Sequence, residues 1–543
     1  MSFDELSKST SFEPHVLTNP VTDDLLPIMG TAENGPMDPG RPHVKQISVN
    51  PMRPVFVIMQ PKPNDLNTVH SGSSALSRLR TLLLHHPSEV DESTVTSLYS
   101  TRIHPALPIL PKSLDADTPP NLQAAILATA LSLSESTRSI SALGWSLVEI
   151  DSPVEIGQTL ADMAATLLQL GARTANTNRS DYMLLAKTIA QAQISGLHLN
   201  PLEWNIPAWE QELRIRLWWS LAIEDAWMSF LNSRPCHIQP NNDSVPIPSL
   251  CSVLEASCAF IAASSDSASS FISSCELAQL VRRLQAEVCT VGGVTVRSAS
   301  ERRDQVVEIN TLADQLFDHW KDSVLGLRPR PTGVTSFLLQ LLGFRCMLKR
   351  IYIELDVGLG AMFTPGDESL LPFEDFVMFI GRWGVHELDG YWSHYTSHIL
   401  SSVTSSLIRL ALASPTSPPA QATDHIARLV SSLNFFRTTT RFDIVDSALE
   451  RASAVAARLR NLGEQERLCQ ALQGSVETML VDEGQDHRGH ARDQDHEQNQ
   501  DHDQDHSFSP ASQSLEDHGD SQASNPLESQ FVWDWNGLDW KAG

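Results

Sequence analysis

The chain has 543 residues, which is long enough for two or three domains or for one large domain with tails. Because 41% of the residues are hydrophobic and only 6% aromatic, a sizeable core is expected in part of the chain but not in all of it. Its net charge of −26 argues against broad nonspecific binding to nucleic acid, which requires a basic surface. Seven cysteines in a chain of this length indicate a reduced, intracellular protein. Neither a secretory signal nor an apolar run long enough to cross a membrane is visible, so a soluble protein is expected.

Three regions along the chain differ in composition. Residues 1–93 are rich in Pro and Ser and are predicted to be disordered, apart from a short helix at 76–85. Residues 94–475 repeat apolar residues at three- and four-residue spacing, which predicts an all-α, multi-helix domain. Residues 476–543 are acidic and predicted to be disordered. The expected helices cover 121–134, 155–172, 181–195, 209–231, 276–289, 301–321, 335–355, 391–413, 424–436 and 444–472.

The expected helix at 209–231 carries the strongest local signal. Leucines recur along it every four residues, and Trp218 and Trp219 widen this stripe until most of the circumference is apolar. Such a helix is typically buried among other helices. Asp225 continues the leucine stripe and therefore faces inward, with Arg234 as its nearest candidate partner. Two interpretations remain open for Asp225: a carboxylate that senses a ligand, or a structural ion pair or loop anchor.

A family resemblance rests on three segments in the same order. They are Leu98-Tyr99 with Ile103-His104-Pro105, the helix from Ala186 that ends in Gly-Leu-His, and a third stretch over 214–248. The third stretch contains Arg214-Ile-Arg-Leu-Trp-Trp-Ser, Asp225, Ser229, Arg234-Pro235, Ile238 and Val245-Pro-Ile-Pro. Together they resemble the fungal-specific transcription factor domain, the middle homology region of zinc-cluster regulators such as the xylanolytic activators.

The resemblance implies a nuclear transcriptional regulator of fungal metabolic genes, with 94–475 as its helical regulatory domain. It implies a role for six residues in holding that domain together: Arg214, Trp218, Trp219, Asp225, Arg234 and Pro235. One departure is Ser233, because the family usually has glycine before Arg-Pro. The preceding Asn232 can take a left-handed conformation, so the turn is expected to survive.

A larger departure concerns zinc. Related regulators carry six N-terminal cysteines that hold two zinc ions, whereas the first cysteine here is Cys236. No cofactor is therefore expected in this chain, and zinc enters only if a cysteine cluster is encoded upstream. The alternative is a partner that contacts DNA, either a zinc-cluster factor or a second copy.

The basic pairs at 282–283, 302–303 and 349–350 are interpreted as solvated faces rather than as import signals or phosphate contacts.

The acidic tail ends in an aromatic segment at 531–540. Residues 481–543 contain 15 acidic and three basic residues, so they hold 12 of the 26 net negative charges. Phe531, Trp533, Trp535, Leu538 and Trp540 alternate with carboxylates, which is typical of segments that recruit coactivators. The alternative is that this segment docks onto the helical domain of its own chain. Repeated Asp-His pairs between 486 and 506 are interpreted as a solvated spacer rather than a metal site.

The sequence contains no recognisable catalytic motif. Phosphate-binding glycine loops, the nucleophile-elbow pattern and the H-E-x-x-H zinc motif are all absent. We therefore expect a regulator rather than an enzyme. The alternative outside regulators is an all-α metabolite-binding protein or an enzyme with an unrecognised site.

Overall fold

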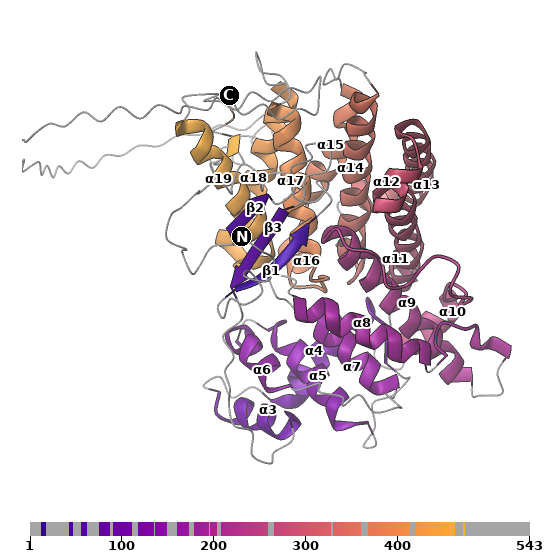
Figure 1. Cartoon of the computed structure of the whole chain (residues 1–543). Coiled ribbons are helices and arrows are strands. Elements are labelled where there is room, and N and C mark those ends of the chain that lie inside the picture. The colour runs from indigo at the N-terminus through magenta and orange to yellow at the C-terminus, as the bar shows by residue number, and fades with distance from the viewer. Residues whose placement is uncertain are drawn as a thin grey trace, which may run out of the picture.

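The structure is a computed structural model, and its described residues form helices α3 to α19 together with one small sheet (Figure 1). The fold class is all-α, as the apolar spacing predicts. The described residues are 12–17, 43–46, 56–61, 75–86, 91–110, 118–134, 136–148, 160–172, 179–194, 196–203, 208–258, 265–326, 329–359, 367–412, 420–461, 468 and 471–472.

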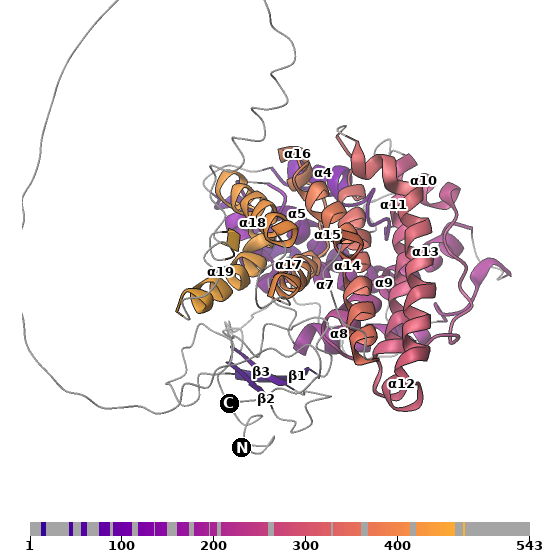
Figure 2. The ribbon, with the colours of Figure 1, turned by 90° about the horizontal axis from the view of Figure 1, so that it is seen from above.

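The helices fall into two groups (Figure 1). One end of the domain gathers α3 (Ala75–Leu84), α4 (Glu92–Arg102), α5 (Pro120–Leu131), α6 (Ser141–Leu147) and α7 (Leu160–Leu170). Between the groups lie α8 (Arg179–Ile194) and α9 (Ala208–Leu231). The other group contains α10 (Leu250–Cys258), α11 (Ser265–Leu284), α12 (Val291–Val296), α13 (Ala299–Leu325), α14 (Val334–Gly358), α15 (Asp367–Ile380), α16 (Val385–Leu388), α17 (Thr396–Leu412), α18 (Ala420–Thr440) and α19 (Asp446–Asn461). Seen from above, α14 lies at the centre of this second group, where it packs against α13, α15 and α17 (Figure 2).

A three-stranded antiparallel sheet lies in the region that the composition predicts to be disordered. It pairs β1 (Phe12–Leu17), β3 (Phe56–Pro61) and β2 (His43–Gln46) in the order β1-β3-β2. These strands are not among the elements that the sequence predicts, while the expected helix at 76–85 is confirmed as α3. The prolines that obscured the strands sit where a sheet tolerates them, since Pro14 is on an edge strand and Pro61 is at a strand end.

Helix α9 is buried on every side, as the apolar circumference predicts. All residues from Ile215 to Leu231 are buried, and the helix packs against α7, α8 and α11. Trp227 stacks on Tyr395 with ring centroids 5.5 Å apart, and Phe344 of α14 meets it edge-on. The domain core therefore forms around α9.

Each of the ten expected helices has a counterpart, but their ends differ. The helix expected from Tyr391 begins only at Thr396, because residues 391–395 form a turn that packs against α9 and α14. Helix α15 is not among the expected ones, since Pro372 in its interior argues against a helix. Helix α11 begins at Ser265, ahead of the expected start. The sequence did not indicate this start, because the first turns of the helix are rich in serine.

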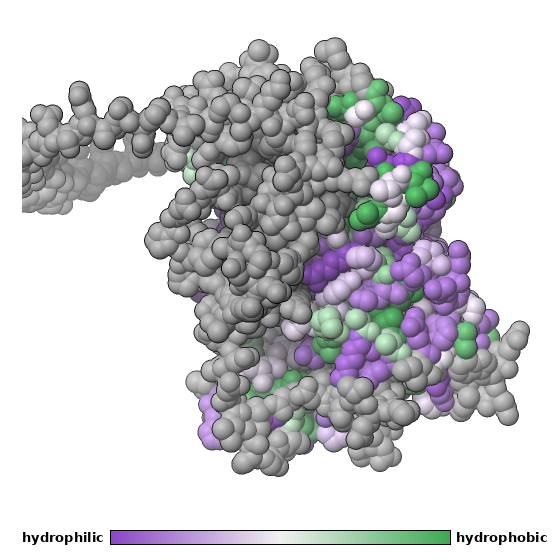
Figure 3. All heavy atoms as spheres, viewed as in Figure 1, coloured by the Kyte–Doolittle hydropathy of each residue, from purple (hydrophilic) through white to green (hydrophobic). Residues whose placement is uncertain are grey.

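On the face seen in Figure 3, hydrophilic and hydrophobic residues of the described surface are interspersed. Val291 and Val296 of α12 are exposed, and hydrophobic residues near this helix are interspersed with hydrophilic ones. Isolated exposed apolar residues of this kind are normal for a folded domain.

Candidate functional site

Asp225 holds the loop that follows α9. Its Oδ1 accepts hydrogen bonds from the backbone N–H of His237 (3.0 Å) and from the Nδ1 position of that ring (2.8 Å). Its Oδ2 accepts from the backbone N–H of Ile238 (2.8 Å), and the Ser229 hydroxyl donates to Oδ1 at 3.3 Å. The carboxylate is completely buried. Backbone amides that satisfy a buried carboxylate are what a loop anchor requires, so the geometry favours that interpretation over a ligand sensor.

Tyr182 of α8 contacts the same loop. Its hydroxyl donates to the carbonyl of Pro235 at 2.9 Å, and the His237 ring lies 4.3 Å from its centroid. The guanidinium carbon of Arg234 lies 4.5 Å from the centroid of the Tyr182 ring, a cation–π contact. Burial raises the pKa of Tyr182, so its phenol remains a donor. The partners of Asp225 are therefore the His237 ring, two backbone amides and the Ser229 hydroxyl, whereas Arg234, its predicted partner, lies over an aromatic ring.

Helix α11 supports the loop from a third side. The Gln285 side chain donates to the carbonyl of Arg234 at 2.8 Å. Nη2 of Arg282 lies within hydrogen-bond distance of the carbonyls of Ile238 and Gln239 and of the Asp243 carboxylate. Arg282 is buried, which corrects the expectation of a solvated face at 282–283. The loop is therefore held by α8, α9 and α11 together.

Asp225→Asn is expected to lower the free energy of unfolding by about 1–3 kcal/mol. The amide group of asparagine replaces one acceptor oxygen, so one buried donor of the His237–Ile238 segment loses its partner. Chemical denaturation measures this change. A matched control is Asp243→Asn at the rim of the same loop, where we expect a smaller loss because the carboxylate is partly exposed. Equal losses for the two variants would contradict the anchor role.

Ser233 itself takes the left-handed conformation that the turn needs, with φ of 54°. The expectation that Asn232 would do so is therefore wrong. The backbone requirement for glycine remains at 233, because a side chain there costs energy in this region.

Ser233→Gly is expected to raise the free energy of unfolding by about 0.5–1 kcal/mol. Glycine removes the left-handed strain and gives back part of that gain through its more flexible unfolded state. Asn241→Gly serves as the control, since Asn241 also has positive φ (66°) but asparagine tolerates it. A melting temperature for Ser233→Gly at or below that of the native protein would show that the serine is not strained.

The other predicted site residues lie on α9. The Nε of Arg214 donates to Glu210 one turn earlier, at 2.9 Å. Trp218 is fully buried, with its ring 6.1 Å from the ring of His198. Trp219 donates from Nε1 to the carbonyl of Pro246 at 2.7 Å, which ties α9 to the Val245-Pro-Ile-Pro segment. Trp219 therefore connects α9 to a neighbouring segment, whereas the Arg214–Glu210 pair lies within the helix.

Arg216 is a residue that the sequence interpretation passed over. It is 3% exposed, and its Nε donates to the carbonyl of Pro108 at 2.8 Å. Its Nη1 and Nη2 lie 3.3 and 3.4 Å from the carbonyls of Ser252 and Leu110. Burial lowers the pKa of Arg216 to about 10, which still leaves it charged at neutral pH. It joins α9 to the 103–110 segment, and its position inside an otherwise buried helix was the available signal.

A polar pair lies between α9 and the turn before α17. Nδ1 of His394 lies 3.7 Å from Oε2 of Glu224, too far for a good hydrogen bond, and both side chains are buried. Neither ring nitrogen of His394, nor Oε2 of Glu224, nor Nε1 of Trp227 has a hydrogen-bond partner in the described structure. Burial, with a smaller contribution from Asp181, raises the pKa of Glu224 to about 8. Burial also lowers the pKa of His394 to about 4, so both groups are neutral near pH 6.

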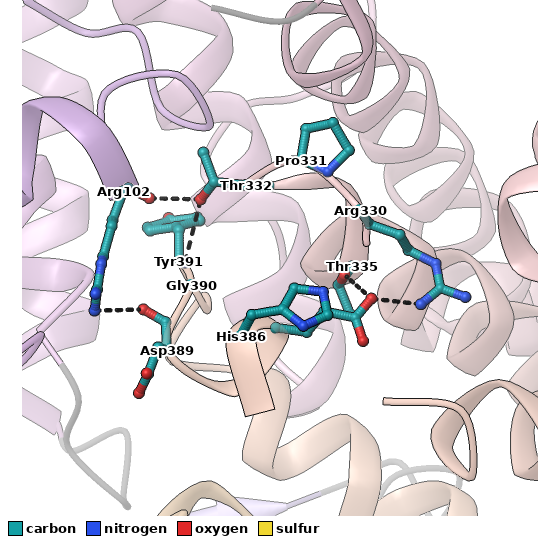
Figure 4. Close-up of a pocket in the computed structure, with 11 residues that line it drawn as sticks. Arg102, Arg330, Pro331, Thr332, Thr335, His386, Asp389, Gly390 and Tyr391 are labelled. Atoms are coloured by element: carbon teal, nitrogen blue, oxygen red, sulfur yellow. Dashed lines mark hydrogen bonds and ion pairs between the residues drawn. The ribbon is translucent and has the colours of Figure 1, made fainter. Parts of the chain in front are cut away.

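A cleft of about 210 Å³ opens where the two groups of helices meet (Figure 4). It is lined by Arg102 at the end of α4, by residues 330–333 and 335 before and within α14, and by residues 386–387 and 389–391 around α16. The hydroxyl of Thr332 donates to the carbonyl of Arg102 at 2.7 Å, which joins two walls. Gly333 has φ of 88°, and a Cβ there would lie 2.6 Å from that of Ala106, so the turn requires glycine.

The described residues contain no cluster of three or more His, Cys, Asp or Glu side chains that could hold a metal ion. Among the helices that the structure describes, none is both long and apolar enough to cross a membrane. The predicted activation segment, Phe531, Trp533, Trp535, Leu538 and Trp540, lies outside the described residues, as does the whole acidic tail.

The fold and these contacts define an all-α protein whose central helix is fixed by a network of buried polar contacts. The chain is similar to a protein of Schizosaccharomyces pombe named as an uncharacterized transcriptional regulatory protein. The two are 26% identical over 521 aligned positions, which cover 91% of this chain and 76% of the relative. No family model and no solved structure matches the chain. The resemblance to the fungal-specific transcription factor domain therefore stays a prediction.

Proposed function

We propose that this protein is a nuclear transcriptional regulator and not an enzyme. The observation that carries the proposal is the similarity to a transcriptional regulatory protein along 91% of the chain. The motif residues between 214 and 248 support it, because their hydrogen bonds hold the loop that follows α9 against this helix. The family resemblance leads us to expect such an arrangement.

In this proposal the helical domain is a platform for regulation and protein interaction at fungal metabolic genes. The acidic tail recruits coactivators through the aromatic residues of 531–540. DNA contact comes from a zinc cluster encoded upstream of this sequence, from a zinc-cluster partner, or through a homodimer. The strong negative charge supports this arrangement, since any DNA contact must be local.

Chromatin immunoprecipitation with sequencing, on the protein tagged at its own locus, tests the regulator role. We expect discrete promoter peaks that are absent from an untagged strain. A shared CGG-type half-site beneath the peaks would point to a zinc cluster, either encoded upstream or carried by a partner. No enrichment in several nutrient conditions would refute the proposal.

A reporter assay with the tail fused to a heterologous DNA-binding domain tests the activation segment separately. Replacing Trp533, Trp535 and Trp540 with alanine is expected to abolish activation. The control replaces Ser524, Ser529 and Asn536 with alanine, which leaves the aromatic residues and the charge unchanged. Equal activity of the two variants would contradict the role of the aromatic residues.

A further inference from the structure

The cleft of Figure 4 contains an arginine, Arg102, that pairs with no carboxylate among the described residues. Nη1 of Arg102 donates to the backbone carbonyls of Leu133 (3.0 Å) and Asp389 (3.3 Å). Among the residues that the structure describes, no acceptor forms a hydrogen bond with Nε or Nη2 of Arg102. Arg102 is only partly buried, so these two groups keep donors for a further acceptor.

The other charges that line the cleft are already paired. Nη1 of Arg330 lies 2.5 Å from Oε1 of Glu387, and both side chains are almost completely buried. The second oxygen of Glu387 accepts from the backbone N–H of Gly384 at 2.7 Å. The Asp389 carboxylate lies 3.9 Å from Nη2 of Arg138. Among the described residues that line the cleft, the positive charge of Arg102 therefore remains uncompensated.

The N-terminus of α14 adds to the positive potential on the same wall. Gly333 and Thr335 line the cleft at this end of a 25-residue helix. The first turn contains no acidic residue, and the cap residue Gly333 supplies no side-chain bond. The partial positive charge of the helix dipole is therefore directed toward the cleft. The carboxylate near this helix end is that of Glu387, which accepts from the Thr335 hydroxyl.

We propose that this cleft binds a small organic carboxylate, held by the free edge of the Arg102 guanidinium. The planar guanidinium matches a carboxylate through two parallel hydrogen bonds. A single negative charge balances Arg102, whereas a phosphate would add a second charge beside Glu387 and Asp389. The cleft volume equals roughly seven water molecules, which limits the ligand to about ten non-hydrogen atoms.

The walls of the cleft come from both groups of helices, so a bound carboxylate would link α4 to α14 and the turn after α16. Regulation of the domain by this ligand rests on the proposed function. The binding step does not, and purified protein tests it without DNA or a partner.

Calorimetric titration of the full chain with acetate, lactate or inorganic phosphate, at constant ionic strength and pH 7, measures the proposed binding. We expect saturable binding of at least one carboxylate with Kd below about 5 mM, and weaker or no binding of phosphate. Arg102→Gln is expected to weaken binding at least tenfold, while Arg102→Lys, which keeps the charge, retains part of the affinity. Arg80→Gln is the matched control and is expected to bind as the native protein does, because Arg80 pairs with Glu92 and neither residue lines the cleft.

Arg102 also holds two backbone carbonyls, so far-UV circular dichroism must show that its variants fold. The exposed His386 gives a second, independent variant. His386→Glu places a negative charge in the lining and is expected to weaken carboxylate binding several-fold, whereas His386→Gln is not. The proposal is overturned if no carboxylate binds saturably, if phosphate binds as tightly, or if folded Arg102→Gln and His386→Glu both bind like the native protein.

Discussion

Replacing Arg216 with alanine is expected to lower the free energy of unfolding by about 3–5 kcal/mol. The guanidinium is 3% exposed and donates to the carbonyl of Pro108, with those of Leu110 and Ser252 also within reach. Alanine leaves these buried carbonyls without the guanidinium donors, and the Glu212 carboxylate loses the cation that lies 4.0 Å away. Chemical denaturation followed by tryptophan fluorescence measures the loss.

The control for this prediction is Arg80→Ala. Arg80 makes three hydrogen bonds to Glu92, at 2.9–3.1 Å, but the two side chains are 48% and 40% exposed. An exposed pair of this kind contributes about 0–1 kcal/mol, so burial rather than the number of bonds decides the difference. Arg216→Lys, which keeps the charge but not the planar fork, should fall between the two. Equal losses for Arg80→Ala and Arg216→Ala would show that Arg216 is not the link between α9 and the 103–110 segment.

The sequence was sufficient to predict the helices whose apolar pattern is strong. Helix α9 is the best example, because a helix that is apolar on all sides has to be buried whatever surrounds it. Helix α15 and strand β1 could not be predicted in the same way. Each contains a proline, Pro372 or Pro14, whose tolerance depends on its neighbours in space rather than in sequence.

The candidate site could be predicted only in part. The four-residue spacing of α9 places Asp225 inward, and this is observed. Its partners are the backbone N–H groups of a loop twelve and thirteen residues later, and no side-chain type marks them in the sequence. For the same reason the 330–335 turn and Arg102, which line one cleft, are separated by more than 200 residues and share no pattern.

The buried pair of Glu224 and His394 predicts an unusual dependence of stability on pH. Burial raises the pKa of Glu224 to about 8 and lowers that of His394 to about 4, from ordinary values of 4.5 and 6.5. Native Glu224 keeps a proton that the unfolded chain releases, so its contribution to stability falls as pH rises from 4.5 to 8. Unfolded His394 binds a proton that the native ring does not, so its contribution falls as pH drops from 6.5 to 4. The two effects cancel between 4.5 and 6.5, and only the loss due to Glu224 remains above 6.5.

Glu224→Gln is therefore expected to gain stability relative to the native protein as pH rises. The difference in free energy of unfolding between the two should change by about 4–5 kcal/mol between pH 4.5 and 8 in the direction that favours the variant. Asp181, Tyr391 and Tyr395 also interact with Glu224, but they are present in both proteins and their direct contributions largely cancel in the difference. Denaturant titrations at four or five pH values measure this difference.

Glu308→Gln is the control, since that carboxylate is exposed beside Arg283. Its removal should leave the fall in stability above pH 6.5 unchanged. A constant difference for Glu224→Gln across this range would mean that water reaches the carboxylate and that the pair is not buried in solution.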